Sequence, residues 1–197
     1  MNVTLRPAPP LPAMTREQFL DWDGHLDGHW EFDGSRPIPM TGGSRGHSLI
    51  AARLIYALMR RLDRTEWKVL VDAGLGTVGD KVRYPDVQVT RTPSPPFAKL
   101  VLGTVAAFEV VSPGSERADR VDKIREYAAV PSIYRYAILE QTAPVLTVLH
   151  RRDGGDGWGA LPPGAGETLE LPELGIAVPV DEIYAGLTFP GDDAPGA

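Results

Sequence analysis

The segments Tyr84-Pro-Asp-Val-Gln-Val89 and Ala107-Phe-Glu-Val-Val-Ser-Pro113 decide the fold of this chain. The first alternates apolar and polar residues over its last three positions, which predicts a half-buried strand. Pro85 fits only at the start of that strand because proline has no N–H to donate to a neighbour, so Asp86 lies where the strand begins. The second segment continues a short apolar run from Val105 and ends in a turn signal, which predicts a central strand buried on both faces.

One acidic residue, Glu109, interrupts the buried strand. A carboxylate in such a place costs several kcal/mol unless it is paired, hydrogen-bonded or bound to a metal ion. Neighbouring strands lie about 4.8 Å apart, so Asp86 and Glu109 are close enough to share a divalent cation. Each acid also has a simpler interpretation: Asp86 as a common turn residue, and Glu109 as half of a buried ion pair with an arginine such as Arg125.

The run 116–127 predicts a helix with two faces. At helical spacing lie a core stripe of Val121, Ile124 and Ala128 and a second stripe of Asp119, Lys123 and Tyr127. If this helix packs beside the Glu109 strand, the flexible stem of Lys123 carries its ammonium toward Glu109. The simpler alternative is a surface ion pair between Lys123 and Asp119, worth about 0.3–0.5 kcal/mol.

An acid at a strand start, an acid in the next strand and a nearby lysine together resemble the PD-(D/E)XK nuclease superfamily. More narrowly, Glu109-Val-Val-Ser-Pro113 followed by Asp119-x-x-x-Lys123-x-x-x-Tyr127 resembles the Uma-type family of proposed restriction endonucleases. The segment Trp30-Glu-Phe-Asp-Gly34, with Met40 and His47 downstream, adds to this resemblance, which covers about 15–187.

The chain departs from the wider superfamily in one important place. Where the superfamily has Glu-x-Lys, this sequence reads Glu109-Val-Val111, so the lysine has to come from the helix as Lys123, as the Uma-type pattern implies. A second departure is the segment 134–140, which ends in Glu140 where the family usually has an aspartate.

The order of strands and helices predicts an α/β (α+β) fold, and the resemblance implies a restriction-endonuclease-like core in which helices flank a central mixed β-sheet. It also implies a metal-dependent endonuclease that hydrolyses phosphodiester bonds in DNA, with Asp86, Glu109 and Lys123 as catalytic residues. Magnesium, or manganese in its place, prefers oxygen ligands, and we expect Asp86, Glu109 and the backbone carbonyl of Val110 to bind it. Lys123 would orient the attacking water or stabilise the phosphate, and it could act as a base only if burial lowered its pKa.

Four further residues are candidates for a supporting role: Glu31, His47, Asp119 and Tyr127. Glu31 either adds a carboxylate to the site or is a surface charge of a hairpin. His47 either contacts a phosphate or caps the helix that begins beside it, and the structural role is favoured.

An alternative of a different class is a catalytically silent module that uses the same fold to bind nucleic acid or protein, acting as a homodimer. The formal net charge of −6 favours this alternative, because a protein that grips DNA over a large surface needs many Lys or Arg. The displaced lysine favours it too, whereas the intact set Asp86, Glu109 and Lys123 favours the nuclease. Fold alone does not decide between the two.

The composition is that of a globular protein, with 43% hydrophobic and 23% charged residues among 197. The absence of cysteine excludes disulfides, thiolate metal sites and cysteine nucleophiles. Neither a signal peptide nor a membrane span is expected, and a cytoplasmic protein is the simplest interpretation. We expect a flexible, proline-rich arm at 1–14, one restriction-endonuclease-like domain at 15–188 and a disordered tail at 189–197.

The remaining elements follow from periodicity and turn signals. The clearest helix is 44–62, and its predicted core stripe consists of Leu49, Ala52, Ile55, Tyr56, Met59 and Leu62. Thr15 and Gln18 form a capping-box pattern for a short helix that ends at Trp22. Further strands are expected at 30–32, 38–40, 68–72, 75–78, 134–139, 145–150, 168–171 and 176–180, a loop or hairpin tip at 153–159 and a last helix at 181–185.

Overall fold

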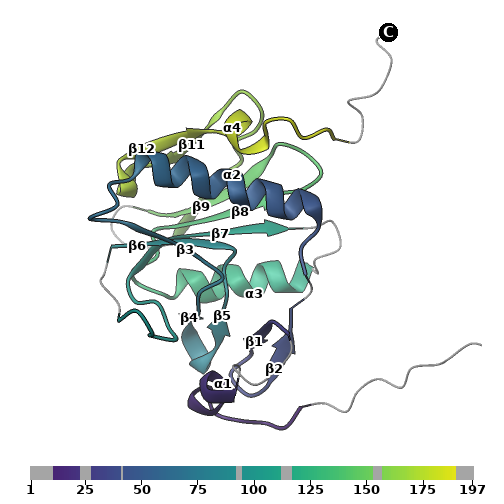
Figure 1. Ribbon diagram of the computed structural model, residues 1–197, viewed down its shortest axis with the longest axis vertical. Helices are drawn as coiled ribbons and strands as arrows, with labels where there is room; N and C mark the ends of the chain where they lie inside the picture. The colour runs from purple at the N-terminus through teal and green to yellow at the C-terminus, as the bar shows by residue number, and fades with distance from the viewer. Residues whose placement is uncertain are drawn as a thin grey trace, which may run out of the picture.

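The computed structural model describes residues 11–22, 28–40, 42–91, 95–111, 117–152 and 157–189. Within residues 117–120 it describes the backbone but not the side chains. Figure 1 shows the arrangement of the helices and strands. Most of the expected arm at 1–14 and of the expected tail at 189–197 lies outside the described residues.

A mixed β-sheet of six strands forms the centre of the described structure, in the order β10-β9-β8-β7-β6-β3. Its strands are β3 (Lys68–Val71), β6 (Val87–Thr90), β7 (Thr104–Val111), β8 (Arg135–Glu140), β9 (Leu146–Arg151) and β10 (Trp158–Leu161). β7 and β8 run parallel, and the other neighbours pair antiparallel. The strands that begin after Asp86 and contain Glu109 are therefore adjacent, and every residue of β7 except Val105 is buried.

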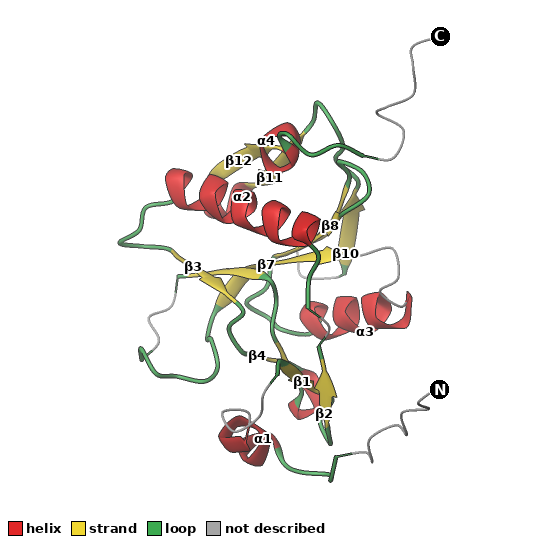
Figure 2. Cartoon of the chain, turned by 45° about the vertical axis from the view of Figure 1, so that its right-hand side comes forward, coloured by secondary structure: helices red, strands yellow, loops and turns green. Residues whose placement is uncertain are grey.

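Helix α2 (Arg45–Arg61) covers one face of this sheet and helix α3 (Arg117–Ala128) covers the other (Figures 1 and 2). The pleat of β7 accounts for both layers, because alternate side chains of a strand point to opposite faces. Phe108 belongs to the core that contains Ile50 and Leu54 of α2, whereas Ala107 belongs to a second core with Tyr127 of α3. A central mixed sheet flanked by helices confirms the predicted fold class.

A second sheet of four short strands, in the order β2-β1-β5-β4, lies on the α3 side of the molecule (Figure 1). Its strands are β1 (Trp30–Phe32), β2 (Pro37–Pro39), β4 (Leu75–Gly76) and β5 (Val82–Arg83), and the short helix η2 (Val78–Asp80) precedes β5. Helix α1 (Arg16–Trp22) packs on this sheet through Phe19, whose ring stacks on Phe32 with centroids 5.0 Å apart. The capping box is present, because the N–H of Thr15 donates to Oε1 of Gln18 and the N–H of Gln18 donates to Oγ1 of Thr15.

The last elements form a hairpin beside α2. They are β11 (Thr168–Leu171), η3 (Pro172–Leu174), β12 (Ile176–Pro179) and α4 (Val180–Tyr184). Arg61 of α2 donates to both carboxylate oxygens of Glu182 at 3.0 Å and 2.6 Å, which ties α4 to α2. None of the helices in the described part of the chain is long and apolar enough to cross a bilayer.

The faces that α2 and α3 bury differ from the predicted faces. The buried residues of α2 are Ile50, Leu54, Ala57 and Leu58. In the predicted stripe of α2, Tyr56 is 64% exposed and Met59 is 40% exposed, and in α3 the predicted core residue Val121 is 42% exposed. α2 is apolar on most of its sides, so helical spacing alone could not choose between two apolar stripes.

Two strands were missed. β5 has only two residues, too few for any periodicity. β10 occupies part of the expected loop at 153–159 and continues to Leu161, where it pairs with β9. Its glycine-rich neighbourhood indicates a turn, and pairing with β9, the strand that precedes it in the chain, makes it extended.

Candidate active site

Asp86 and Glu109 lie side by side on neighbouring strands. β6 and β7 pair antiparallel with Val87 opposite Phe108, so the residue before β6 aligns with Glu109. The Oδ2 atom of Asp86 accepts a hydrogen bond of 2.7 Å from the backbone N–H of Val110. Both carboxylates line one cleft, so the structure brings together the two acids that were expected to share a cation.

Helix α3 supplies two side chains that hold Glu109. The Nζ atom of Lys123 lies 3.0 Å and 2.9 Å from the two carboxylate oxygens of Glu109. The hydroxyl of Tyr127, one turn further along α3, donates to Oε1 of Glu109 at 2.9 Å. Glu109 therefore pairs with a lysine and a tyrosine of the facing helix, and not with Arg125, which is exposed.

Glu31 reaches the same lysine from strand β1. Its Oε1 atom lies 3.0 Å from Nζ of Lys123, and its Oε2 atom accepts a hydrogen bond of 2.9 Å from Nη1 of Arg83. Glu31 is only 7% exposed, so it is a buried member of the site and not a surface charge of the hairpin.

Behind Glu31 lie two charged residues that the sequence did not single out. Glu126 of α3 accepts hydrogen bonds from Nε and Nη2 of Arg83 at 2.7 Å and 2.8 Å. Glu126 is 3% exposed and also accepts a bond of 2.7 Å from Nζ of Lys81. The one local signal was the spacing of Lys81 and Arg83, because residues two apart on a strand share a face.

Burial and neighbouring charge set the protonation of this cluster. Burial raises the pKa of Glu109, and the charges of Glu31 and Asp86 raise it further against the opposing effect of Lys123. Burial alone would lower the pKa of Lys123, but the charges of Glu109 and Glu31 outweigh it and raise that pKa well above its usual range. Burial also raises the pKa of Tyr127, so its hydroxyl stays a neutral donor. The ammonium of Lys123 therefore stays protonated, and the condition for it to act as a base is not met.

His47 contacts Asp86 and does not cap α2. Its Nε2 atom lies 3.1 Å from Oδ2 of Asp86, and this hydrogen bond raises the pKa of His47 against the opposing effect of burial. The N-cap of α2 is Ser44, whose Oγ accepts the backbone N–H of His47 at 3.1 Å. The predicted capping role of the His47 side chain is therefore wrong. Asp119 lies in α3, but its side chain is outside the described part of the chain.

The charged residues Glu31, His47, Arg83, Asp86, Glu109 and Lys123 line a cleft of roughly 390 Å³. Its walls are Glu31, Ile38, Pro39, Met40, Gly42, Gly43, Ser44, His47, Arg83, Asp86, Glu109, Val110, Val111, Lys123 and Gln141. The cleft thus lies between the first turn of α2, the β1–β2 hairpin and the end of β7. Ser44 closes one side of it by donating to Oε1 of Gln141 at 2.5 Å.

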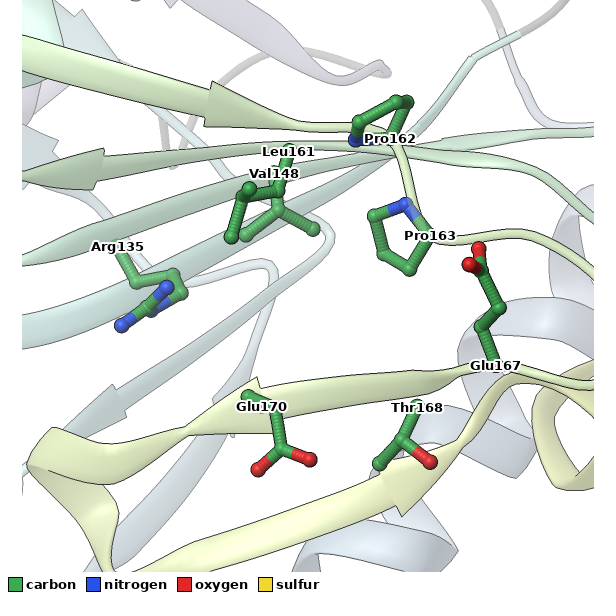
Figure 3. Close-up of a pocket in the computed structure, with 8 residues that line it drawn as sticks. All are labelled: Arg135, Val148, Leu161, Pro162, Pro163, Glu167, Thr168 and Glu170. Atoms are coloured by element: carbon green, nitrogen blue, oxygen red, sulfur yellow. The ribbon is translucent and has the colours of Figure 1, made fainter.

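A second cavity, of roughly 400 Å³, lies between the central sheet and the β11–β12 hairpin (Figure 3). Arg135 is the cationic residue in its lining, and its Nε and Nη2 atoms donate to Glu173 at 2.7 Å and 2.8 Å. The guanidinium is therefore engaged already, and the other lining residues form no acid–base set. The cleft at Asp86 is the stronger candidate for chemistry.

The charges of the cleft fit a hard divalent cation. Its lining contains three acidic residues, Glu31, Asp86 and Glu109, and three basic residues, His47, Arg83 and Lys123. Among the described residues, no group of three His, Cys, Asp or Glu is arranged to hold a metal by itself. Magnesium typically takes one or two carboxylates with water and substrate oxygens, whereas a zinc site needs three or four protein ligands. The pair Asp86 and Glu109 therefore fits a hard divalent cation that keeps some of its water ligands.

The chain is similar to a known protein family, to a relative of known sequence and to a solved structure. A family model described as "Putative restriction endonuclease" (Uma2) matches residues 16–181. A protein of Synechocystis sp., described as "Uncharacterized protein slr1290", is 32% identical over 193 residues, which cover 93% of this chain and 97% of the relative. A crystal structure titled as that of a "putative nuclease belonging to DUF820" from Anabaena variabilis superposes with a TM-score of 0.67. That likeness covers 87% of this chain and 97% of the other at 12% identity, and it shows the fold alone.

Proposed function

Since the chain belongs to the Uma2 restriction-endonuclease family, we propose that it is a metal-dependent endonuclease that hydrolyses phosphodiester bonds in DNA. The observation that carries the proposal is the meeting of Asp86, Glu109 and Lys123 in one cleft. Two carboxylates that can hold a cation and a protonated amine beside them are groups that can catalyse phosphodiester hydrolysis, because negative charge builds up on the phosphate as water attacks.

Each residue of the set has a proposed part in the reaction. Asp86 and Glu109, with the backbone carbonyl of Val110, would hold Mg²⁺ or Mn²⁺. Such an ion, when bound, stabilises charge on the phosphate and makes hydroxide available near neutral pH. Lys123, whose ammonium lies 3.0 Å and 2.9 Å from the oxygens of Glu109, neutralises charge on the phosphate oxygens. Tyr127 and His47 orient Glu109 and Asp86 through their hydrogen bonds.

DNA as substrate and a homodimer as the working form are parts of the same proposal. Arg45, exposed in the first turn of α2 next to the cleft residue Ser44, is in place to contact a phosphate. Sedimentation velocity tests the dimer, and a single monomeric species at every concentration measured would reject it.

The central experiment is cleavage of supercoiled plasmid with Mg²⁺ or Mn²⁺, and with EDTA as the blank. The wild type should nick the plasmid only with metal, and Asp86→Asn, Glu109→Gln and Lys123→Met should each lose at least about 100-fold in rate, the scale of one lost charge-stabilising group. Glu182→Gln is the matched control, because Glu182 pairs with Arg61 outside the cleft. Failure of the wild type to cut any plasmid, single-stranded DNA or RNA substrate with either ion would reject the nuclease.

One observation favours a second candidate, a silent module that binds nucleic acid or protein. Lys123 already neutralises Glu109, so the site is balanced without a metal ion, and the chain carries a formal net charge of −6. A silent module would bind DNA or a protein equally well with and without EDTA, and Glu109→Gln would leave that binding unchanged. A nuclease requires the metal for turnover. The wild type and Glu109→Gln, each measured with and without EDTA, therefore separate the two candidates.

A further inference from the structure

The ammonium of Lys123 lies between two carboxylates that come from different elements. Its Nζ atom is 3.0 Å from Oε1 of Glu31 in β1 and 2.9 Å from Oε2 of Glu109 in β7. The lysine side chain is 16% exposed, and those of the two glutamates are 9% and 12% exposed. The ammonium of Lys123 is therefore shared by two nearly buried carboxylates. If it loses contact with one of them, it still contacts the other.

Glu31 is held in place without help from Lys123. It gives one oxygen to each neighbour, with Oε2 accepting from Arg83 at 2.9 Å and Oε1 facing the lysine. Arg83 is fixed in turn by its two hydrogen bonds to Glu126, at 2.7 Å and 2.8 Å. A guanidinium that bonds a carboxylate through two parallel N–H groups has a fixed orientation, so Arg83 gives Glu31 a fixed support that does not depend on Lys123.

Glu109 is placed differently, because it lies beside Asp86 of the neighbouring strand. Both of its oxygens lie within 3.0 Å of Nζ of Lys123. When Glu109 gives these oxygens to a divalent cation, the like charges of the cation and the ammonium repel each other strongly in a site that excludes most water. Lys123 then has to loosen its contact with Glu109, and Glu31 is the carboxylate that still lies at hydrogen-bond distance.

We infer that Glu31, fixed by Arg83 and Glu126, is a positioning residue that keeps the ammonium of Lys123 in the cleft while Glu109 coordinates a divalent cation. The inference rests on the proposed function, since it requires metal binding by Glu109. It also gives a role to the buried chain Glu126–Arg83–Glu31, which provides a second place for the lysine so that metal and ammonium occupy the cleft together.

The experiment is a double-mutant cycle read by Mn²⁺ affinity, measured by electron paramagnetic resonance of free Mn²⁺ on the full chain. Glu31→Gln should weaken Mn²⁺ binding about tenfold, because an ammonium without its second partner stays on Glu109 and competes with the ion. In the Lys123→Met background the competitor is absent, so adding Glu31→Gln should change the affinity by no more than about twofold, the usual error of additivity.

Three results would overturn the inference. In the first, Glu31→Gln leaves Mn²⁺ affinity at the wild-type value, which removes any role of Glu31 in metal binding. In the second, the tenfold loss persists in the Lys123→Met background, and Glu31 then acts simply as one more negative charge near the ion. In both cases the nuclease proposal stands if the wild type cuts DNA with metal. Absence of Mn²⁺ binding by the wild type, the third result, would instead reject the metal-dependent function and the inference together.

Two further variants keep the experiment interpretable if Glu31→Gln does not fold. Glu126→Gln weakens the support of Glu31 from behind, so it should reproduce part of the loss of Mn²⁺ affinity, again only when Lys123 is present. If Glu31→Gln does not fold by circular dichroism, the cycle is run with Glu126→Gln in its place, and an equal loss in both backgrounds rejects the inference. Glu170→Gln, an exposed site on β11, should bind Mn²⁺ as the wild type does.

Discussion

The carboxylate of Asp86 is tied to the backbone of the neighbouring strand, because its Oδ2 atom accepts the N–H of Val110 at 2.7 Å. Val110 follows Glu109 directly, so this one bond sets the spacing of the two acids of the cleft. His47 contacts the same oxygen from α2 at 3.1 Å. The position of Asp86 therefore depends on the pairing of β6 with β7, on a main-chain donor and on a helix.

Two replacements of Asp86 should separate its contribution to stability from its proposed role in catalysis. Asp86→Ala leaves the N–H of Val110 without its acceptor, which should lower the free energy of unfolding by about 1–3 kcal/mol. Asp86→Asn keeps an acceptor oxygen at that position and should cost clearly less. Urea denaturation in EDTA measures both variants, and equal costs would show that the hydrogen bond to Val110 contributes nothing.

Lys123→Met and Glu109→Gln should differ in their effect on stability without metal. Lys123→Met leaves Glu31 and Glu109 without their shared cation, and breaking a buried pair in this way typically costs about 3–5 kcal/mol. Glu109→Gln leaves Lys123 paired with Glu31 and removes a carboxylate whose pKa is raised by burial, so its cost should be smaller. The midpoints of urea unfolding in EDTA give the order, and the reverse order contradicts the shared-cation arrangement.

Glu126 should make stability depend on pH in acid. Burial raises the pKa of Glu126, but hydrogen bonds from Arg83 and Lys81 outweigh burial and leave this pKa below its usual value of 4.5. A carboxyl whose pKa is lower in the folded state contributes its full stability above the unfolded value, and this contribution disappears as pH falls through the folded value. Glu126→Gln should therefore flatten the loss of stability below about pH 4.5. Denaturation at a series of pH values in EDTA checks this, with Glu170→Gln expected to follow the wild-type curve.

Gly34 should resist substitution more than Gly42. Gly34 lies in the β1–β2 turn at φ +95°, and a Cβ there would overlap the carbonyl oxygen of Gly79. Gly34→Ala should lower the free energy of unfolding by about 1–3 kcal/mol, the range for a strained backbone position. A Cβ on Gly42 meets no atom within 4 Å, so Gly42→Ala should be close to neutral. Similar melting temperatures for the two variants would contradict this difference.

Local sequence pattern predicted most of the strands and helices but not the faces they bury. The α2 helix was predicted as 44–62 and runs from Arg45 to Arg61, because its cap and its composition are local signals. Its buried side was missed because Ile50 and Leu54 differ from the predicted stripe only in what they meet on the sheet. The same limit explains Val121, whose exposure depends on how α3 is rotated against β7.

The sequence predicted those residues of the candidate site whose burial without a partner is energetically unfavourable. A carboxylate such as Glu109 in an apolar strand needs a partner whatever the fold, and the structure gives it Lys123 and Tyr127. Arg83 and Glu126 could not be found in this way, because each is an ordinary charge in its own segment. They become informative only when β5 and α3, far apart in the chain, meet in space.

The parallel step from β7 to β8 has a consequence for where a catalytic lysine can be placed. Parallel neighbours need a crossover that leaves one end of the sheet and returns to the other, and α3 is that crossover. Helix α3 runs alongside β7, the strand that carries Glu109. A long side chain on α3 can therefore contact the carboxylate of Glu109, as a side chain of the strand itself could. Lys123 contacts Glu109 in this way, with its Nζ atom 3.0 Å and 2.9 Å from the two carboxylate oxygens.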